Sequence, residues 1–169
     1  MEQTNNNNKT YLWVAVGCLV IFICVIAVFI FGFGGLVWLG LQTPDNVTTS
    51  INTPINANAG DDFEFTITVT NTGTDAFVLT SIDISLDYLE GFVISETSPP
   101  HKGKSQYDAL GGGETFQSYT FQRTIAAGET VTISFFGKAI LAGDFSGTIF
   151  MCVDNEFNCA TNVARTIIN

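Results

Sequence analysis

The sequence has few of the side chains on which catalysis, metal binding and nucleic-acid binding depend. Its 169 residues include one histidine, four cysteines and six Lys or Arg, against sixteen Asp or Glu. The resulting net charge of −10 repels phosphate backbones and argues against a nucleic-acid partner. A single histidine excludes a blue-copper site, which needs two imidazoles. We therefore expect no catalytic residue, no cofactor and no resident metal.

The acidic pairs and the histidine do not change this expectation. His101 follows two prolines in a polar segment without a nucleophile motif, so a Ser-His-Asp triad is disfavoured. The two acidic pairs are Asp61 with Asp62 and Asp154 with Glu156. Neither pair has the spacing of an EF-hand calcium loop. Solvated loops are therefore the favoured interpretation, and calcium binding stays an alternative for both pairs.

Charged residues, Asn, Gln, His and Pro are all absent from the apolar run Tyr11–Leu41. As a helix, these roughly 30 residues would be about 45 Å long, whereas about 20 residues cross a bilayer. The run predicts a transmembrane helix, with Trp13 and Trp38 at the two membrane interfaces. A signal peptide is the alternative, but its apolar region is usually about 7–15 residues long and ends at a small-x-small site, which is missing here.

The flanks of the run predict its orientation. Lys9 lies in the polar head, residues 1–10, and the next basic residue is Lys102. The positive-inside rule places the head in the cytoplasm and the residues after the linker, 42–46, outside the cell membrane. The polar composition of the head predicts that it is disordered. Close approach of two helices is favoured by small residues in the run, which predicts a weak homo-oligomer through Gly32, Gly34 and Gly35.

Residues 47–169 carry the alternation of β-strands. In Phe63–Thr70, apolar residues alternate with Glu64 and three threonines, so that each set occupies one face. A turn at Asn71–Asp75 follows, and we expect the strands on its two sides to neighbour each other. The expected strands are Val47–Ile51, Phe63–Thr70, Phe77–Leu86, Thr115–Ile125, Thr130–Ala139, Ser146–Val153 and Asn158–Ile168.

About seven short strands with turns between them and no amphipathic helix predict an all-β, immunoglobulin-like antiparallel sandwich. A barrel is the alternative, although nothing in the spacing requires closure. Both tryptophans lie in the apolar run, so the antibody pattern of Cys, Trp and Cys is absent.

Three stretches have a distinctive pattern of turns and strands: Thr66–Asp75 (TITVTNTGTD), Ile125–Ile133 (IAAGETVTI) and Gly143–Val153 (GDFSGTIFMCV). They resemble the immunoglobulin-like repeats of prokaryotic envelope proteins, among them the cell-adhesion-related domain found in bacteria (CARDB). The resemblance covers most of residues 47–168 and consists of turn and strand patterns. It implies a noncatalytic extracytoplasmic module for adhesion, spacing or assembly, and it transfers no binding residue to this chain.

The cysteines form two groups. Cys18 and Cys24 lie in the apolar run, where a small apolar thiol needs no special role. Cys152 and Cys159 flank six residues that we interpret as a hairpin loop. Opposed residues of such a hairpin are close enough for a disulfide, and an external compartment favours oxidation. The alternative is a pair of reduced thiols in the cytosol.

The segment Ser95–Glu114 is the longest stretch without strand periodicity. Long loops in compact domains are usually functional or disordered, and both interpretations stay open. As a partner-binding loop, the segment would use five residues: His101, Lys102, Lys104, Tyr107 and Leu110. The two lysines would attract an acidic partner to an otherwise acidic domain.

These features predict a single-pass protein that displays one sandwich outside the cell membrane. Its partners would be the lipid bilayer and another envelope protein or surface polymer. A subunit of a surface filament is the alternative, although a pilin-like start would need a Gly before the apolar run and a Glu inside it, and both are missing. An enzyme is disfavoured by the absence of catalytic motifs.

Overall fold

The computed structural model describes residues 16–17, 19–29, 43–109 and 112–169. The chain divides into two compact units, Met1–Leu41 and Gln42–Asn169. In the first unit, residues 16–17 and 19–29 are helical, and their large apolar side chains are exposed. Within the described residues, no helix is both long and apolar enough to cross a membrane. Five residues with predicted membrane or packing roles lie outside the described residues: Trp13, Gly32, Gly34, Gly35 and Trp38.

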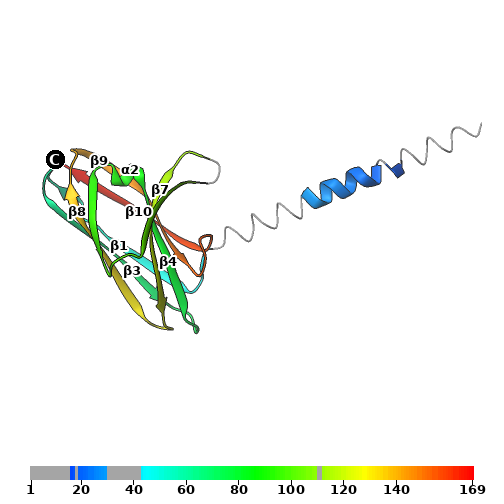
Figure 1. The fold of residues 1–169 in the computed structure, drawn as a ribbon, viewed down its shortest axis with the longest axis horizontal. Coiled ribbons are helices and arrows are strands. Elements are labelled where there is room, and N and C mark those ends of the chain that lie inside the picture. Colours follow the sequence, from blue (N-terminus) through cyan, green and yellow to red (C-terminus); the bar gives the residue numbers. More distant parts are fainter. Residues whose placement is uncertain (1–15, 18, 30–42, 110–111) are drawn as a thin grey trace, which may run out of the picture. The chain divides into compact units, whose positions relative to one another are not determined.

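The second unit is a β-sandwich of two sheets (Figure 1). The four-stranded sheet has the order β1 (Val47–Asn52), β3 (Asp62–Asn71), β8 (Thr130–Ala139) and β5 (Phe92–Ser98). The six-stranded sheet has the order β2 (Asn56–Ala57), β10 (Cys159–Ile168), β9 (Gly143–Val153), β4 (Phe77–Ser85), β7 (Thr115–Ile125) and β6 (Gly103–Asp108). Every pairing is antiparallel except that of β2 with β10.

The core lies between the sheets and is built from the alternate residues of each strand. In β3, Phe63, Phe65, Ile67 and Val69 are buried, as the alternation predicts. The Phe65 ring stacks on Phe135 of the neighbouring strand β8, with 4.7 Å between centroids. Burial of such aromatic pairs supplies much of the stability of a sandwich, because each ring removes a large apolar area from water.

The predicted all-β sandwich is confirmed, but its described residues form ten strands instead of about seven. The residue alternation in the sequence did not predict β2, β5 or β6. A register shift between Ile94 and Glu96 interrupts the alternation of β5, and β6 is a polar edge strand without a buried face. Periodicity detects a strand only when one face is buried.

A short helix, α2 (Leu86–Leu89), also lies in the sandwich, where no helix was expected. The Ser85 hydroxyl accepts a hydrogen bond from the Asp87 amide at 3.3 Å and caps the start of α2. Tyr88 is fully buried, and its hydroxyl lies 2.7 Å from that of Thr53 and 3.1 Å from that of Thr166. The helix therefore joins the end of β4 to the core instead of extending the strand to Leu86.

The expectation that the strands on either side of Asn71–Asp75 pair with each other is wrong. β3 pairs with β1 and β8, whereas β4 pairs with β7 and β9 in the other sheet. Alternation determines which face of a strand is buried, but it carries no information about the neighbouring strand. The turn between β3 and β4 is a connection from one sheet to the other.

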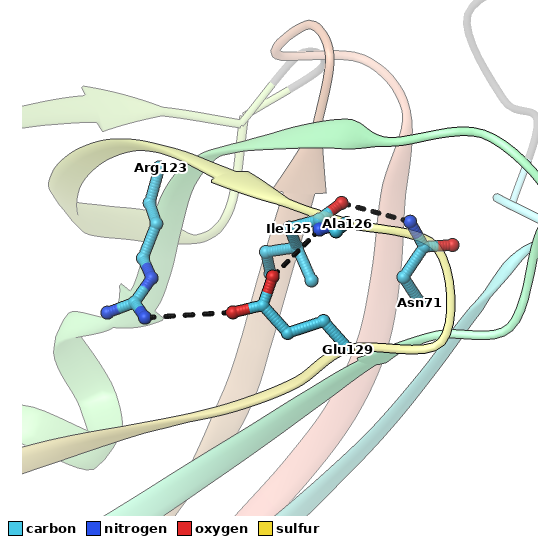
Figure 2. Close-up of polar contacts among 5 residues, drawn as sticks. All are labelled: Asn71, Arg123, Ile125, Ala126 and Glu129. Atoms are coloured by element: carbon cyan, nitrogen blue, oxygen red, sulfur yellow. Dashed lines mark hydrogen bonds and ion pairs between the residues drawn. The ribbon is translucent and has the colours of Figure 1, made fainter.

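Asn71 holds this connection at the end of the sandwich (Figure 2). Its buried side-chain nitrogen donates to the carbonyls of Ile125 at 3.0 Å and Asp75 at 2.9 Å. In the adjacent turn, a Glu129 carboxylate oxygen accepts from the Ala126 amide at 2.8 Å. The β3–β4 connection and the β7–β8 turn are therefore held together by side chains.

Candidate functional site

The segment Ser95–Glu114 is not the long loop that the sequence predicts. β5 continues to Ser98, residues 99–102 cross from the four-stranded to the six-stranded sheet, and β6 follows at Gly103–Asp108. Leu110, the fifth predicted contact residue, lies outside the described residues. The other four predicted contact residues lie in the crossing or on β6, so they are positioned by a sheet.

His101 is fixed within the crossing. Its Nδ1 atom lies 3.0 Å from the Thr97 hydroxyl oxygen, which also accepts from the His101 amide at 2.9 Å. The imidazole meets the Tyr119 ring edge-on, with 5.3 Å between centroids. These contacts assign His101 a structural part in the connection.

Lys102 and Lys104 are both exposed. The Lys102 ammonium donates to the Gln122 carbonyl at 3.1 Å, and the Lys104 ammonium lies 5.2 Å from the centroid of the Tyr119 ring. Burial raises the pKa of Tyr119 to about 12. An ammonium group has three N–H donors, and Lys102 uses one of them here. Both lysines therefore keep donors and charge at the surface.

β6 is an edge strand with one neighbour, β7. Five of its six residues are exposed, and Gly103 is half-buried. The opposite edge of the strand faces no other strand of the described sheets. An edge strand presents backbone N–H and C=O groups with which another chain can pair. Two of the predicted contact residues, Lys104 and Tyr107, thus belong to a strand that is open for pairing.

Tyr107, also on β6, reaches across the sheet to Asp83 on β4. Its hydroxyl donates to Asp83 Oδ2 at 3.0 Å. Asp83 is only 4% exposed, although it lies on the outer face of the sheet, opposite the core residues Ile82 and Ile84. Asp83 Oδ1 is buried and accepts no hydrogen bond. The structure therefore joins a predicted contact residue to a carboxylate that the sequence analysis did not single out.

Aromatic rings surround this contact. Tyr107 stacks on Phe116 with 5.6 Å between centroids, and Phe116 lies 5.0 Å from Phe150. Phe116 is fully buried although it is not part of the core between the sheets. We call Asp83, Tyr107, Phe116 and Phe150 the outer-face cluster. Its residues come from four strands, β4, β6, β7 and β9.

The environment of Tyr107 favours its neutral form. Burial is the largest cause that raises the pKa of the Tyr107 hydroxyl, followed by the negative charge of Asp83 and the hydrogen bond to it. The charges of Glu156 and Glu114 raise it further. The region around the outer-face cluster is therefore negative.

The predicted disulfide is confirmed: Cys152 and Cys159 are bonded and face each other across β9 and β10. Cys152 Sγ lies 3.6 Å from Asp83 Oδ2. A disulfide sulfur carries no hydrogen, so this contact is not a hydrogen bond to the carboxylate. The disulfide thus lies next to the outer-face cluster but donates no hydrogen bond to the Asp83 carboxylate.

Three of the four acids considered for calcium have other polar partners. The Asp61 carboxylate accepts from the Asn58 side chain at 2.9 Å, and Asp62 lies 3.2 Å from the Lys138 ammonium. Asp154 accepts from the Val78 amide at 2.9 Å. In the part of the chain that the structure describes, no three His, Cys, Asp or Glu side chains form a group suited to a metal.

The sequence carried no signal that singles out Asp83. The outward residues of β4 are Ser81, Asp83 and Ser85, small or acidic in a strand with two neighbours, and all three are buried. An outward Asp in an alternating strand is usually solvated, so periodicity alone gave no reason to single it out.

No family model matches the chain, and no curated protein matches it in sequence. Among solved structures, it is similar to AvmM, which catalyses macrocyclization in alchivemycin A biosynthesis. The TM-score is 0.53 at 14% identity, over 77% of this chain and 92% of AvmM. At this identity the similarity shows a shared fold and says nothing about catalysis.

Two further similar structures are also β-sandwich domains. One is the CARDB domain of PF1109 from Pyrococcus furiosus, solved with di-metal ions, with a TM-score of 0.40 at 15% identity over 75% of this chain and 91% of that domain. The other is the cupredoxin domain of amoB from Nitrosocaldus yellowstonii, with a TM-score of 0.46 at 8% identity over 76% and 90%. Both similarities are too distant to support an inference about this chain.

Proposed function

We propose that the protein is a noncatalytic interaction module of a prokaryotic cell envelope that binds another envelope protein along edge strand β6. The observation that carries the proposal is the open edge of β6, with Lys102 and Lys104 exposed beside it. The partner supplies an extended, acidic segment that pairs with the backbone of β6 as an added strand. The two lysines increase the rate of encounter, because the rest of the domain repels acidic partners.

Membrane anchoring is part of this proposal. It is supported by the uncharged composition of Tyr11–Leu41, and Lys9 supports a cytoplasmic N-terminus. The immunoglobulin-like, CARDB-like character of the sandwich is supported by its two-sheet architecture and by the sequence resemblance. A module of this kind would hold its partner close to the bilayer.

A crosslinking experiment tests binding at β6. A photo-crosslinking residue is placed at Ser105 on β6 of the full chain, in native membranes, and at Thr68 on β3 as a control site. We expect one protein to crosslink at Ser105 and not at Thr68. Lys102→Glu with Lys104→Glu should reduce the yield about fivefold or more, and the loss should be smaller at high salt.

A matched double variant controls for net charge. Lys138→Glu with Arg165→Glu makes the same change on β8 and β10, where both residues form exposed ion pairs that contribute little to stability. This variant should crosslink like the wild type. Equal losses in both double variants, or crosslinking that is equal at Ser105 and Thr68, would refute binding at β6.

A further inference from the structure

Asp83 is a buried acid that forms no ion pair with any basic residue in the described part of the chain. The residue is 4% exposed. Among the described residues, the neutral Tyr107 hydroxyl is its one hydrogen-bond donor, and Oδ1 has no partner. The ion pairs among the described residues join other acids, namely Glu129, Asp62 and Asp144. An unpaired carboxylate in such a site is costly, and a buried polar atom without a partner points to a missing one.

The surroundings of Asp83 specify the charge of the missing partner. Asp83, Glu156 and Glu114 all act on the Tyr107 hydroxyl as negative charges. The disulfide sulfur beside Oδ2 offers no hydrogen. A cation that donates a hydrogen bond would compensate the charge and satisfy Oδ1 at the same time.

The rings of the outer-face cluster indicate an organic cation. The ring centroids of Tyr107 and Phe116 are 5.6 Å apart, and those of Phe116 and Phe150 are 5.0 Å apart. Aromatic faces attract alkylammonium groups, and they also cover an aliphatic chain. Calcium needs six to eight oxygen ligands, which one carboxylate and one phenol do not supply. A quaternary ammonium has no N–H with which to satisfy Oδ1.

We propose that the outer-face cluster binds a primary ammonium group, which donates to Asp83 Oδ1 while its carbon chain lies against the rings of Tyr107 and Phe150. Tyr107 is 41% exposed. In this proposal, its ring rotates outward to admit the ligand. The ligand is either a lysine side chain of a partner protein or a small free amine. This site is on the face of the sheet, so it stands whether or not β6 pairs with a partner strand.

Thermal unfolding of the full chain in detergent tests the proposal. The probe is n-butylammonium chloride, and tetramethylammonium chloride is the matched salt without N–H donors. The wild type should show a saturable increase in Tm with n-butylammonium that exceeds the effect of tetramethylammonium. Asp83→Asn keeps the shape and an acceptor for Tyr107 but removes the charge, and it should raise the apparent Kd at least about tenfold.

Asp87→Asn is the control variant, because Asp87 is an exposed acid four residues away on α2. It should respond like the wild type. If Asp83→Asn does not fold, the carboxyl ¹³C signal of Asp83 in wild-type protein should still shift with n-butylammonium and not with tetramethylammonium. An increase in Tm that is equal for both salts, or equal in wild type and Asp83→Asn, would overturn the proposal.

A blocked tripeptide, acetyl-Gly-Lys-Gly-amide, separates the two sources of the ligand. Binding at least as tight as that of n-butylammonium assigns the site to a lysine of a partner protein. Binding of n-butylammonium alone assigns it to a free amine. If neither probe gives a saturable, Asp83-dependent response, the site does not bind primary ammonium groups.

Discussion

The hydroxyl of Tyr107 donates to the carboxylate of Asp83 at 3.0 Å, from the edge of the six-stranded sheet to its central strand β4. The bond passes over β7, the strand between them, so it ties the exposed edge strand to the middle of the sheet. The sequence analysis predicted Tyr107 as a contact residue for a partner. In the structure, its hydroxyl also binds a buried acid.

Alkaline pH should destabilise the sandwich through its tyrosines. Burial raises the pKa of Tyr88, Tyr107 and Tyr119 above the ordinary value of 10.0, so the folded state retains protons that the unfolded state loses. The free energy of unfolding should be insensitive to these groups below pH 10 and should fall as the pH rises through the folded pKa values. Urea unfolding between pH 8 and 12 measures this, and Tyr107→Phe should flatten the decline. An unchanged slope in that variant would contradict the raised pKa of Tyr107.

Removal of the disulfide should lower stability by about 2.5 kcal/mol, the chain-entropy value for so short a loop. The bridge joins residues seven apart in sequence. The change is the double variant Cys152→Ala with Cys159→Ala, and the measurement is denaturant unfolding of oxidised wild type against the variant. Wild type treated with a reductant should move toward the variant. No difference between oxidised wild type and the double variant would show that the bridge adds nothing to stability.

Asn71→Ala should destabilise the domain by about 2 kcal/mol, because two carbonyls at one end of the sandwich lose their donor. Asn71 is fully buried and donates to the Ile125 carbonyl, as Figure 2 shows. It also donates to the Asp75 carbonyl. Glu129→Gln is the control in the same turn. It retains an acceptor for the Ala126 amide and loses only the exposed ion pair with Arg123, at 4.0 Å, so it should cost less than about 0.5 kcal/mol. Equal effects of the two changes would argue against the assigned role of Asn71.

Phe135→Ala should cost about 4 kcal/mol, as is usual when a buried ring is removed from a packed core. Phe135 is fully buried and contacts Phe65, Tyr119 and Phe121. Val163 on β10 is 72% exposed, and Val163→Ala should change stability by less than about 0.5 kcal/mol. Chemical denaturation of both variants tests whether the core lies where the alternation of β3 and β8 predicts it.

Much of the sandwich was predictable because alternation is a local property of the chain. Phe63–Thr70 and Thr130–Ala139 show one apolar face each, and both are buried strands in the structure. The Cys152–Cys159 bridge was predictable for the same reason, since a hairpin brings together residues that are close in sequence. β6 escaped detection because it buries no face.

The sequence by itself determined the all-β class, the main strands, the disulfide and the position of the basic residues. The tertiary structure alone decided that β3 and β4 belong to different sheets and that Tyr107 and Cys152 meet at Asp83. Side-chain alternation follows from the geometry of each strand and can be read one residue at a time. The order of strands depends on packing between segments far apart in the chain, and that order buried Asp83 without a basic partner.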